Sequence, residues 1–135
     1  MRSTATTFKD AGKDFPRGTV LFNEGDIGTE MYLINSGEVR LSRKTEQGVV
    51  VLGVLGFGEF FGEMSVITNK PRTITAEAVS DCRLNVISKD VLETLVTGNP
   101  LVALSILKKL MFRLEDAYGL IEEFFVKQIK QDENK

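Results

Sequence analysis

The spacing of apolar residues changes once along this chain, and that change restricts the fold more than any other feature of the sequence. From Phe15 to about Ile87, short apolar runs alternate with glycine-bearing turns. From Pro100 onward glycine nearly disappears, and apolar residues recur every three or four positions. The first pattern is typical of strands and the second of helices. A β half followed by a helical segment is therefore predicted.

Six short segments have the composition of strands: residues 19–22, 31–34, 39–41, 49–55, 74–78 and 83–87. The turn Asn35-Ser36-Gly37 lies between the second and the third, which predicts a β-hairpin there. The fourth, Val49 to Leu55, is nearly all apolar, which predicts a strand buried on both faces. Short strands at this spacing favour a mainly β fold, an antiparallel sandwich or barrel of jelly-roll type.

Two helices are predicted after the strands. A short one begins at Ser88 or Asp90 and ends before Gly98, and the last one runs from about Leu101 to Gln131. The last helix would be roughly 46 Å long. Its apolar stripe follows heptad spacing and consists of Leu107, Leu110, Leu114, Ala117, Ile121, Phe124 and Gln128, widened by Met111, Tyr118 and Phe125. Either the stripe covers the chain's own barrel or it pairs with a second copy. Half of the helix reaches past a small barrel, so a homodimer is expected.

Composition excludes several kinds of site. The chain has 17 basic and 19 acidic residues, no histidine, and Cys82 as its one cysteine. Histidine-bound haem, four-thiolate iron–sulfur clusters, most zinc sites and nucleophiles with an imidazole base are therefore excluded. A net charge of −2 gives no global attraction for nucleic acid or an anionic membrane. No apolar run reaches the roughly 18 residues of a membrane span, and a lone cysteine suits a reducing compartment, so a cytoplasmic location is expected. Cys82 is expected to be a small strand residue.

The segment that carries chemistry runs from Gly56 to Ser65 and is followed by Pro71-Arg72-Thr73. Its glycines do not have the spacing of a dinucleotide fingerprint, and it lacks the Gly-Lys-Ser/Thr of a P-loop. Backbone N–H groups at Gly62 to Ser65, together with the guanidinium of Arg72, would form a receptor for a single phosphate. The carboxylate of Glu63 accepts hydrogen bonds, and a sugar hydroxyl is a natural donor to it.

These residues resemble the phosphate-binding cassette of cyclic nucleotide-binding domains. The cassette match consists of Phe61-Gly62-Glu63-Met64-Ser65, a nine-residue step from Glu63 to Arg72, and Pro71-Arg72-Thr73-Ile74-Thr75-Ala76. A surrounding framework also agrees, namely Phe15-Pro16-Arg17-Gly18, Glu24-Gly25-Asp26, Tyr32-Leu33-Ile34, Ser36-Gly37-Glu38-Val39 and Gly56-Phe57-Gly58. The resemblance covers the chain from about Phe15 to its end.

The resemblance implies an antiparallel β-roll of eight strands, a jelly-roll-like double-stranded β-helix. A short internal helix and a long C-terminal helix that serves as hinge, lid or dimer interface complete the family fold. It also implies roles for single residues: Glu63 for the ribose 2′-hydroxyl, Arg72 for the cyclic phosphate, Thr73 for the phosphate or base, and the backbone of Gly62, Met64 and Ser65 for the phosphate and ribose. Residues 1–14 are then an N-terminal extension, 15–99 the roll, and 100–135 a lid or dimerisation helix with a charged tail.

The expected function is that of a sensor domain whose ligand is cyclic AMP or cyclic GMP, with no cofactor, metal or catalytic residue. Thr73 allows guanine, but nothing else points to it, so cyclic AMP is expected. An apolar lid over the base is expected from Leu110, Met111 and Leu114, with Arg113 or Asp116 reading a base edge. Regulators of the catabolite activator type continue into a DNA-binding module. Only Lys127 to Lys135 follows the stripe here, so DNA binding by this chain alone is not expected, and the output effector is unknown.

Two alternatives belong to other classes of protein. One is a scaffold or oligomerisation domain that keeps the fold and binds no nucleotide. The other is a barrel-type enzyme acting on a small molecule, which the absence of histidine disfavours. Titration with cyclic nucleotides separates the first from a sensor, and metal analysis tests the second.

Overall fold

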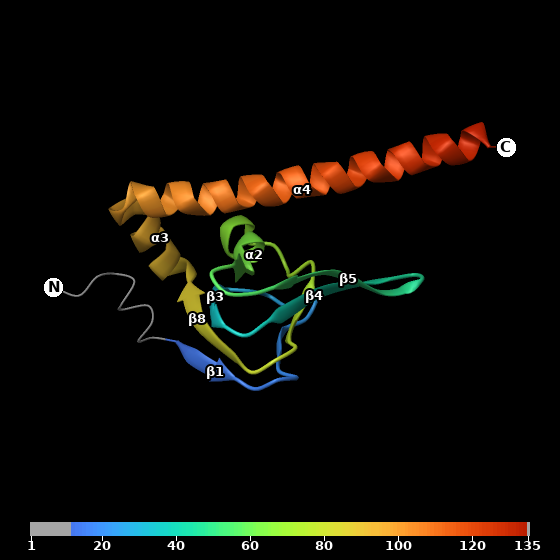
Figure 1. The fold of residues 1–135 in the computed structure, drawn as a ribbon. Coiled ribbons are helices and arrows are strands. Elements are labelled where there is room, and N and C mark those ends of the chain that lie inside the picture. Colours follow the sequence, from blue (N-terminus) through green and yellow to red (C-terminus); the bar gives the residue numbers. More distant parts are fainter. Residues whose placement is uncertain (1–11, 135) are drawn as a thin grey trace. The chain divides into compact units, whose positions relative to one another are not determined.

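Two antiparallel sheets make up the first part of the chain in the computed structural model, which describes residues 12–134 (Figure 1). The strands are β1 (Lys13–Phe15), β2 (Val20–Phe22), β3 (Glu30–Ser36), β4 (Val39–Thr45), β5 (Gly48–Leu55), β6 (Phe60–Phe61), β7 (Thr75–Ala78) and β8 (Cys82–Ser88). The helices are α2 (Glu63–Thr68), α3 (Lys89–Gly98) and α4 (Pro100–Glu133). The eight-stranded antiparallel β-roll with a short internal helix and a long C-terminal helix is thereby confirmed.

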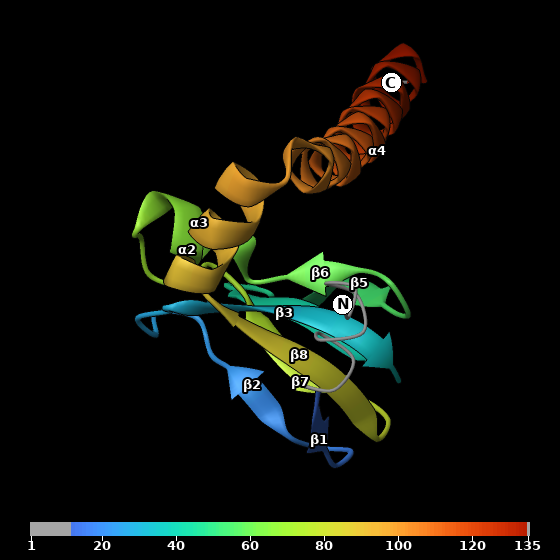
Figure 2. The same cartoon turned by 90° about the vertical axis from the view of Figure 1, so that its left-hand side faces the viewer.

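One sheet has the strand order β1-β8-β3-β6 and the other β2-β7-β4-β5. Figure 2 shows β3 and β8 side by side at the centre of the first sheet, where Ile34 is paired with Leu84. In the second sheet Val39 is paired with Ala78. These four side chains are buried and belong to one apolar cluster, so the core lies between the two sheets. Burial of these apolar side chains is the main stabilising contribution to such a roll.

The turn at Asn35-Ser36-Gly37 does not close a hairpin, and that prediction is wrong. β3 pairs with β8 and β6, whereas β4 pairs with β5 and β7, so the turn carries the chain from one sheet to the other. Gly37 has φ +91°, and a Cβ there would lie 2.4 Å from the carbonyl oxygen of Asp81. A tight turn with a glycine in the left-handed region therefore serves as a corner between sheets as well as a hairpin end.

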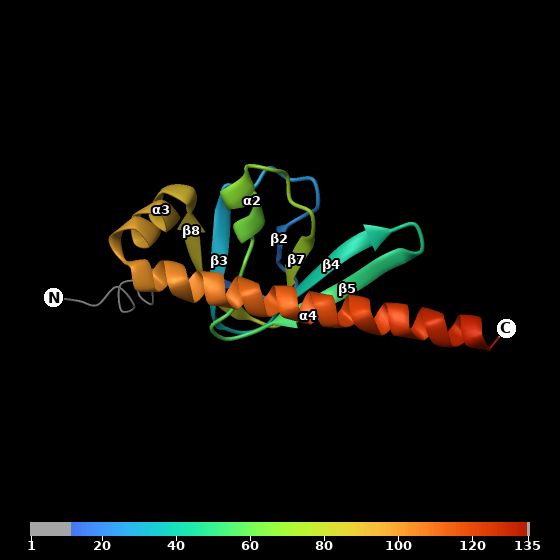
Figure 3. The same ribbon diagram turned by 90° about the horizontal axis from the view of Figure 1, so that it is seen from above.

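The strand from Val49 to Leu55 is not buried on both faces, and that prediction is also wrong. β5 ends its sheet and pairs with β4 alone among the described strands, so Val49 is 65% and Leu52 is 55% exposed. β-branched residues favour an extended backbone, so the composition indicates a strand. Burial also requires other parts of the fold to pack against each face of the strand, and the composition of the strand does not reveal them. The hairpin in this region is the one between β4 and β5 (Figure 3), where Thr45 Oγ1 donates to the Gly48 carbonyl at 2.7 Å.

Two short strands, β1 and β6, were not predicted from the residue pattern. β1 pairs with β8, and β6 pairs with β3 through Tyr32 opposite Phe61. The Tyr32 and Phe61 rings are stacked with centroids 5.0 Å apart. β6 matters for function because it attaches the glycine-containing segment before α2 to the core.

Both predicted C-terminal helices are present; the cap at Ser88 was expected, whereas the cap at Asn99 was not predicted. The Ser88 hydroxyl accepts from the backbone N–H of Val91 at 3.3 Å at the start of α3, which ends at Gly98. The Asn99 side chain accepts from the N–H of Leu101 at 3.1 Å, and Pro100 takes the first position of α4. This is the usual arrangement of a polar N-cap followed by proline.

The chain divides into two compact units, one ending at Leu92 and the other beginning at Glu93, and each is described by itself. Most of the expected N-terminal extension, residues 1–11, lies outside the described residues, and β1 begins at Lys13. Among the described helices, none alone has the length and apolar composition needed to cross a membrane. The α3–α4 pair meets that test only when the two helices are taken together, on length and composition.

Candidate functional site

The segment from β6 into α2 begins at a glycine with an unusual backbone conformation. Gly62 has φ 83° and ψ 4°, in the left-handed region that glycine adopts at little cost. It precedes α2 as its N-cap and, having no side chain, supplies no side-chain cap hydrogen bond. The opening N–H groups of a helix have no partner within the helix. A group that accepts hydrogen bonds is therefore favoured at this position.

The side chain of Arg72 reaches this segment from the loop before β7. Its Nη1 donates to the carbonyl oxygen of Gly62 at 2.7 Å, and its Nη2 donates to the carbonyl oxygen of Glu30. The guanidinium carbon lies 4.0 Å from the centre of the Phe22 ring, within the range of a cation–π interaction. Arg72 is only 6% exposed. A fixed positive charge is therefore buried beside the start of α2.

The backbone of Arg72 is held as firmly as its side chain. Its N–H donates to the carbonyl oxygen of Asp26 at 2.8 Å, and its carbonyl oxygen accepts from the N–H of Gly25 at 2.8 Å. These two bonds attach the loop between β2 and β3 to the loop before β7. The two loops and the start of α2 thus form one hydrogen-bonded unit around the guanidinium.

The charge of Arg72 is maintained at some energetic cost. Burial lowers the pKa of its guanidinium, while the nearby Tyr32, Glu30, Asp26 and Glu63 act in the opposite direction. Arginine nevertheless stays protonated at neutral pH because its ordinary pKa is above about 12. Its Nε is buried and has no hydrogen-bond partner among the residues that the structure describes. An unpaired buried donor on a cation favours the arrival of an anionic acceptor.

The other residues expected in the site differ in exposure. Glu63 in the first turn of α2 is 7% exposed, and Ser65, two residues later, is also buried. Met64 is 62% exposed and Thr73 is exposed, so both present side chains to solvent. The charge of Glu63 acts against the lowering of the Arg72 pKa that burial causes. The structure therefore brings Arg72 to Gly62, and Glu63 is the next residue along the chain.

The expected base lid lies on α4, in the second compact unit, and is described within that unit only. Met111 and Leu114 are exposed, and Leu110 and Arg113 are partly exposed. The remaining apolar side chains of the stripe, from Leu107 to Phe125, are also largely exposed on α4. Their role in a lid or in a dimer stays a prediction.

Three residues of the site were not found by sequence reasoning. Glu30 contributes its backbone carbonyl, which no side-chain motif encodes, and Phe22 was interpreted only as an apolar strand residue. Gly28 lies against the guanidinium, because a Cβ there would be 2.0 Å from Arg72 Nε. A glycine within the polar loop before β3 was the only available signal for it.

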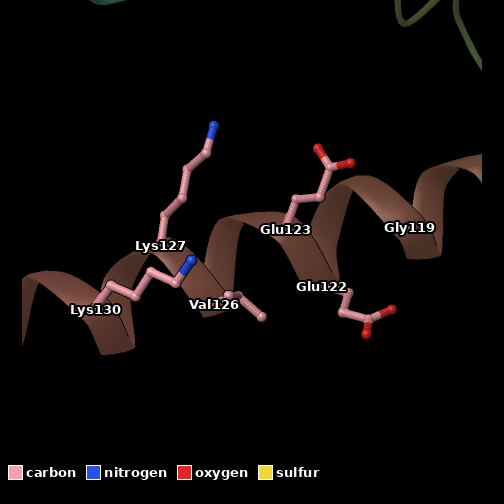
Figure 4. Close-up of a pocket in the computed structure, with 6 residues that line it drawn as sticks. All are labelled: Gly119, Glu122, Glu123, Val126, Lys127 and Lys130. Atoms are coloured by element: carbon pink, nitrogen blue, oxygen red, sulfur yellow. The ribbon is translucent and has the colours of Figure 1, made fainter.

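A shallow hollow on α4 has a different character (Figure 4). It is lined by Gly119, Glu122, Glu123, Val126, Lys127 and Lys130. Its four charged side chains extend outward from the helix, and a Cβ on Gly119 would meet nothing within 4 Å. The hollow is therefore the space left by a glycine on a solvated helix face, with no buried polar group to hold a ligand.

Comparison with known proteins identifies relatives of the chain. The sequence profile of the family described as "Cyclic nucleotide-binding domain" matches residues 12–99. A "CRP-like cAMP-activated global transcriptional regulator" of Mycobacterium tuberculosis is 33% identical over 102 residues, 75% of this chain and 46% of that protein. A "Cyclic AMP receptor protein" of Thermus thermophilus is 38% identical over 104 residues, 76% of this chain and 48% of that protein.

A solved structure agrees with these sequence matches. The crystal structure of the Thermus thermophilus catabolite activator protein superposes with a TM-score of 0.74 and 34% identity, covering 84% of this chain and 55% of that one. The chain spans about half the length of the curated relatives named above.

Proposed function

Because this chain belongs to the cyclic nucleotide-binding domain family, we propose that it binds a cyclic mononucleotide, cyclic AMP in preference, as the sensor part of a regulatory protein. The observation that carries the proposal is the buried guanidinium of Arg72 beside Gly62, the residue at which α2 begins. A cyclic phosphate diester bears one negative charge on two free oxygens. Both a cation and backbone N–H donors are suited to that group.

The phosphate is proposed to bind between Arg72 and the backbone N–H groups of Gly62, Met64 and Ser65. In the structure the two Nη atoms donate to neutral backbone carbonyls, and Nε has no hydrogen-bond partner within residues 12–134. An anionic oxygen accepts stronger hydrogen bonds than a neutral carbonyl does. Phosphate binding therefore replaces weak or missing interactions of a buried cation with charge-assisted ones.

Glu63 is proposed to accept a hydrogen bond from the ribose 2′-hydroxyl. An ionised carboxylate beside a phosphate site would repel the ligand unless the ligand also offers it a donor, and the ribose hydroxyl is such a donor. This pairing explains why an acidic residue is compatible with an anion site. It also gives the site selectivity for ribonucleotides over their 2′-deoxy analogues.

The proposed preference for adenine rests on the two curated relatives compared above, because the name of each includes cyclic AMP. Thr73 is exposed and available to either base. We propose that Leu110, Met111, Arg113 and Leu114 of α4 contact the base when the helix closes over it. Binding would then shift the population of helix positions and pass the signal on. Hydrogen exchange along α4 that does not respond to saturating cyclic AMP would contradict this transmission.

The exposed stripe from Leu107 to Phe125 supports a second part of the proposal, a homodimer through α4. Apolar side chains at heptad spacing on a helix surface are typically buried by another helix. The site holds no proposed catalytic group, so we propose that the nucleotide is bound and released unchanged. A nucleotide recovered as its hydrolysis product would contradict that point.

Isothermal titration calorimetry of the full chain with cyclic AMP, cyclic GMP and cyclic di-GMP tests the proposal. We expect saturable binding of cyclic AMP at one site per chain and weaker binding of cyclic GMP. Arg72→Ala should weaken binding by more than tenfold, while Arg83→Ala, which removes a partly exposed arginine paired with Asp14, should leave it unchanged. A folded chain that gives no heat with any of the three would favour the scaffold alternative.

A further inference from the structure

We propose that Gly28 is a positioning residue of this site, because its missing side chain leaves the space in which the Arg72 guanidinium lies. The inference rests on the proposed function in so far as Arg72 binds the phosphate. Gly28 would thus help to position the phosphate-binding arginine, although it lies in the loop before β3, outside the cassette.

The space is defined by three short distances. A Cβ on Gly28 would lie 2.0 Å from Nε, 2.2 Å from Cζ and 2.6 Å from Nη2 of Arg72. Nonbonded carbon atoms make their best contacts at about 3.5–4.0 Å, so this Cβ would overlap the guanidinium. The backbone of Gly28 does not adopt the left-handed conformation that otherwise calls for glycine. Glycine is therefore required here for its small size, and its conformational freedom is not the reason.

The guanidinium has little freedom to move aside. Its Nη atoms are bonded to the carbonyls of Gly62 and Glu30, and its carbon lies 4.0 Å from the Phe22 ring centre. On the side of the cassette the space is also tight, since a Cβ on Gly62 would lie 2.9 Å from Nη1. A methyl group at position 28 would therefore break at least one of the two hydrogen bonds from Arg72 to the Gly62 and Glu30 carbonyl oxygens. It would also move the guanidinium away from the start of α2. We expect Gly28→Ala to weaken cyclic AMP binding by at least tenfold.

The first experiment needs no nucleotide. Nuclear magnetic resonance of the full chain is expected to show a slowly exchanging Nε–H for Arg72, because this atom is buried, and Arg72→Lys identifies the signal by its loss. Gly28→Ala should shift that signal and speed its exchange with water. The matched control is Gly53→Ala, since Gly53 has an ordinary φ and nothing within 4 Å of its Cβ position. An unchanged Arg72 signal in a folded Gly28→Ala chain would overturn the inference.

The second experiment compares backgrounds. Gly28→Ala should weaken cyclic AMP binding and lower the melting temperature in the wild-type chain. In the Arg72→Ala chain it should do neither, because the clashing atoms are gone, and equal effects in both backgrounds would contradict a role through Arg72. If Gly28→Ala alone does not fold, folding of the Gly28→Ala/Arg72→Ala double variant supports the inference, and failure of both overturns it. A wild-type chain that binds no nucleotide refutes the proposed function, while the resonance comparison still decides the role of Gly28.

Discussion

Removing the Arg72 side chain should destabilise the ligand-free fold as well as weaken binding. Arg72→Ala leaves the carbonyls of Gly62 and Glu30 without their charged donor and removes the cation from the Phe22 ring. Each charge-assisted hydrogen bond contributes about 1.5–3 kcal/mol and the cation–π contact about 1 kcal/mol. Relief of the buried charge and of the unpartnered Nε offsets about 2 kcal/mol. The expected net loss of unfolding free energy is about 3 kcal/mol, or roughly 10 °C in melting temperature.

Urea denaturation followed by tyrosine fluorescence measures this loss. A Tyr118→Phe background leaves Tyr32 as the sole tyrosine, and its ring is stacked on Phe61 within the first compact unit. Arg83→Ala is the matched control, since its ion pair with Asp14 at 2.9 Å is exposed and should contribute less than about 1 kcal/mol. If Arg72→Ala shifts the urea midpoint no more than Arg83→Ala does, the interactions of the Arg72 guanidinium with Gly62, Glu30 and Phe22 do not stabilise the fold.

Three further predictions concern other parts of the chain. Burial and the charge of Glu30 raise the pKa of Tyr32 above 10.0, against the opposing effect of Arg72. The stability that the neutral phenol contributes is therefore fully present below pH 10 and is lost as the pH rises through the folded-state pKa of Tyr32. Alkaline difference absorbance of the Tyr118→Phe chain should give a titration midpoint above pH 10 for Tyr32. A midpoint at or below pH 10 would contradict this. Glu63→Gln should weaken cyclic AMP binding by about threefold to tenfold, less than Arg72→Ala does, and should affect 2′-deoxy cyclic AMP less; equal losses for both ligands would argue against the ribose contact. Light scattering should give a dimer for the full chain and a monomer for a chain ending near Leu107, and monomers for both would limit the stripe to contacts within one chain.

The general fold was predictable because each part has a local signal. Glycine-bearing turns separate the strands, and the cap at Ser88 begins α3 at a position that capping chemistry predicts. The change from strand to helix spacing correctly separated the β-roll from α4. These features depend on neighbouring residues alone, which is why the sequence contains them.

Strand partners and burial were not predictable in the same way. Gly37 has the conformation expected of a tight turn, yet the strands on either side of it belong to different sheets. The valines of β5 have the composition of a buried strand but lie at a sheet edge. Both outcomes depend on residues distant in the sequence, such as the β7 and β8 partners, which periodicity does not report.

In the candidate site, too, some residues were found from the sequence and others only from the structure. Residue chemistry and the resemblance to the cassette indicated Gly62, Glu63 and Arg72, and the structure places the Arg72 guanidinium against the Gly62 carbonyl. The supporting contacts come from the backbone of Glu30 and the absent side chain of Gly28. A backbone carbonyl has no residue-type signature, and the glycine at position 28 does not tell which side chain fills the space beside it, so the folded structure is needed to find both contacts.

A crystal structure of the full chain grown with cyclic AMP tests the central claim most directly. We predict that the cyclic phosphate lies within hydrogen-bond distance of the Arg72 guanidinium and of the backbone N–H groups from Gly62 to Ser65, with the 2′-hydroxyl donating to Glu63. The charge-assisted contacts should measure about 2.7–2.9 Å. A phosphate bound to other residues, or crystals without nucleotide after growth at saturating cyclic AMP, would contradict the account.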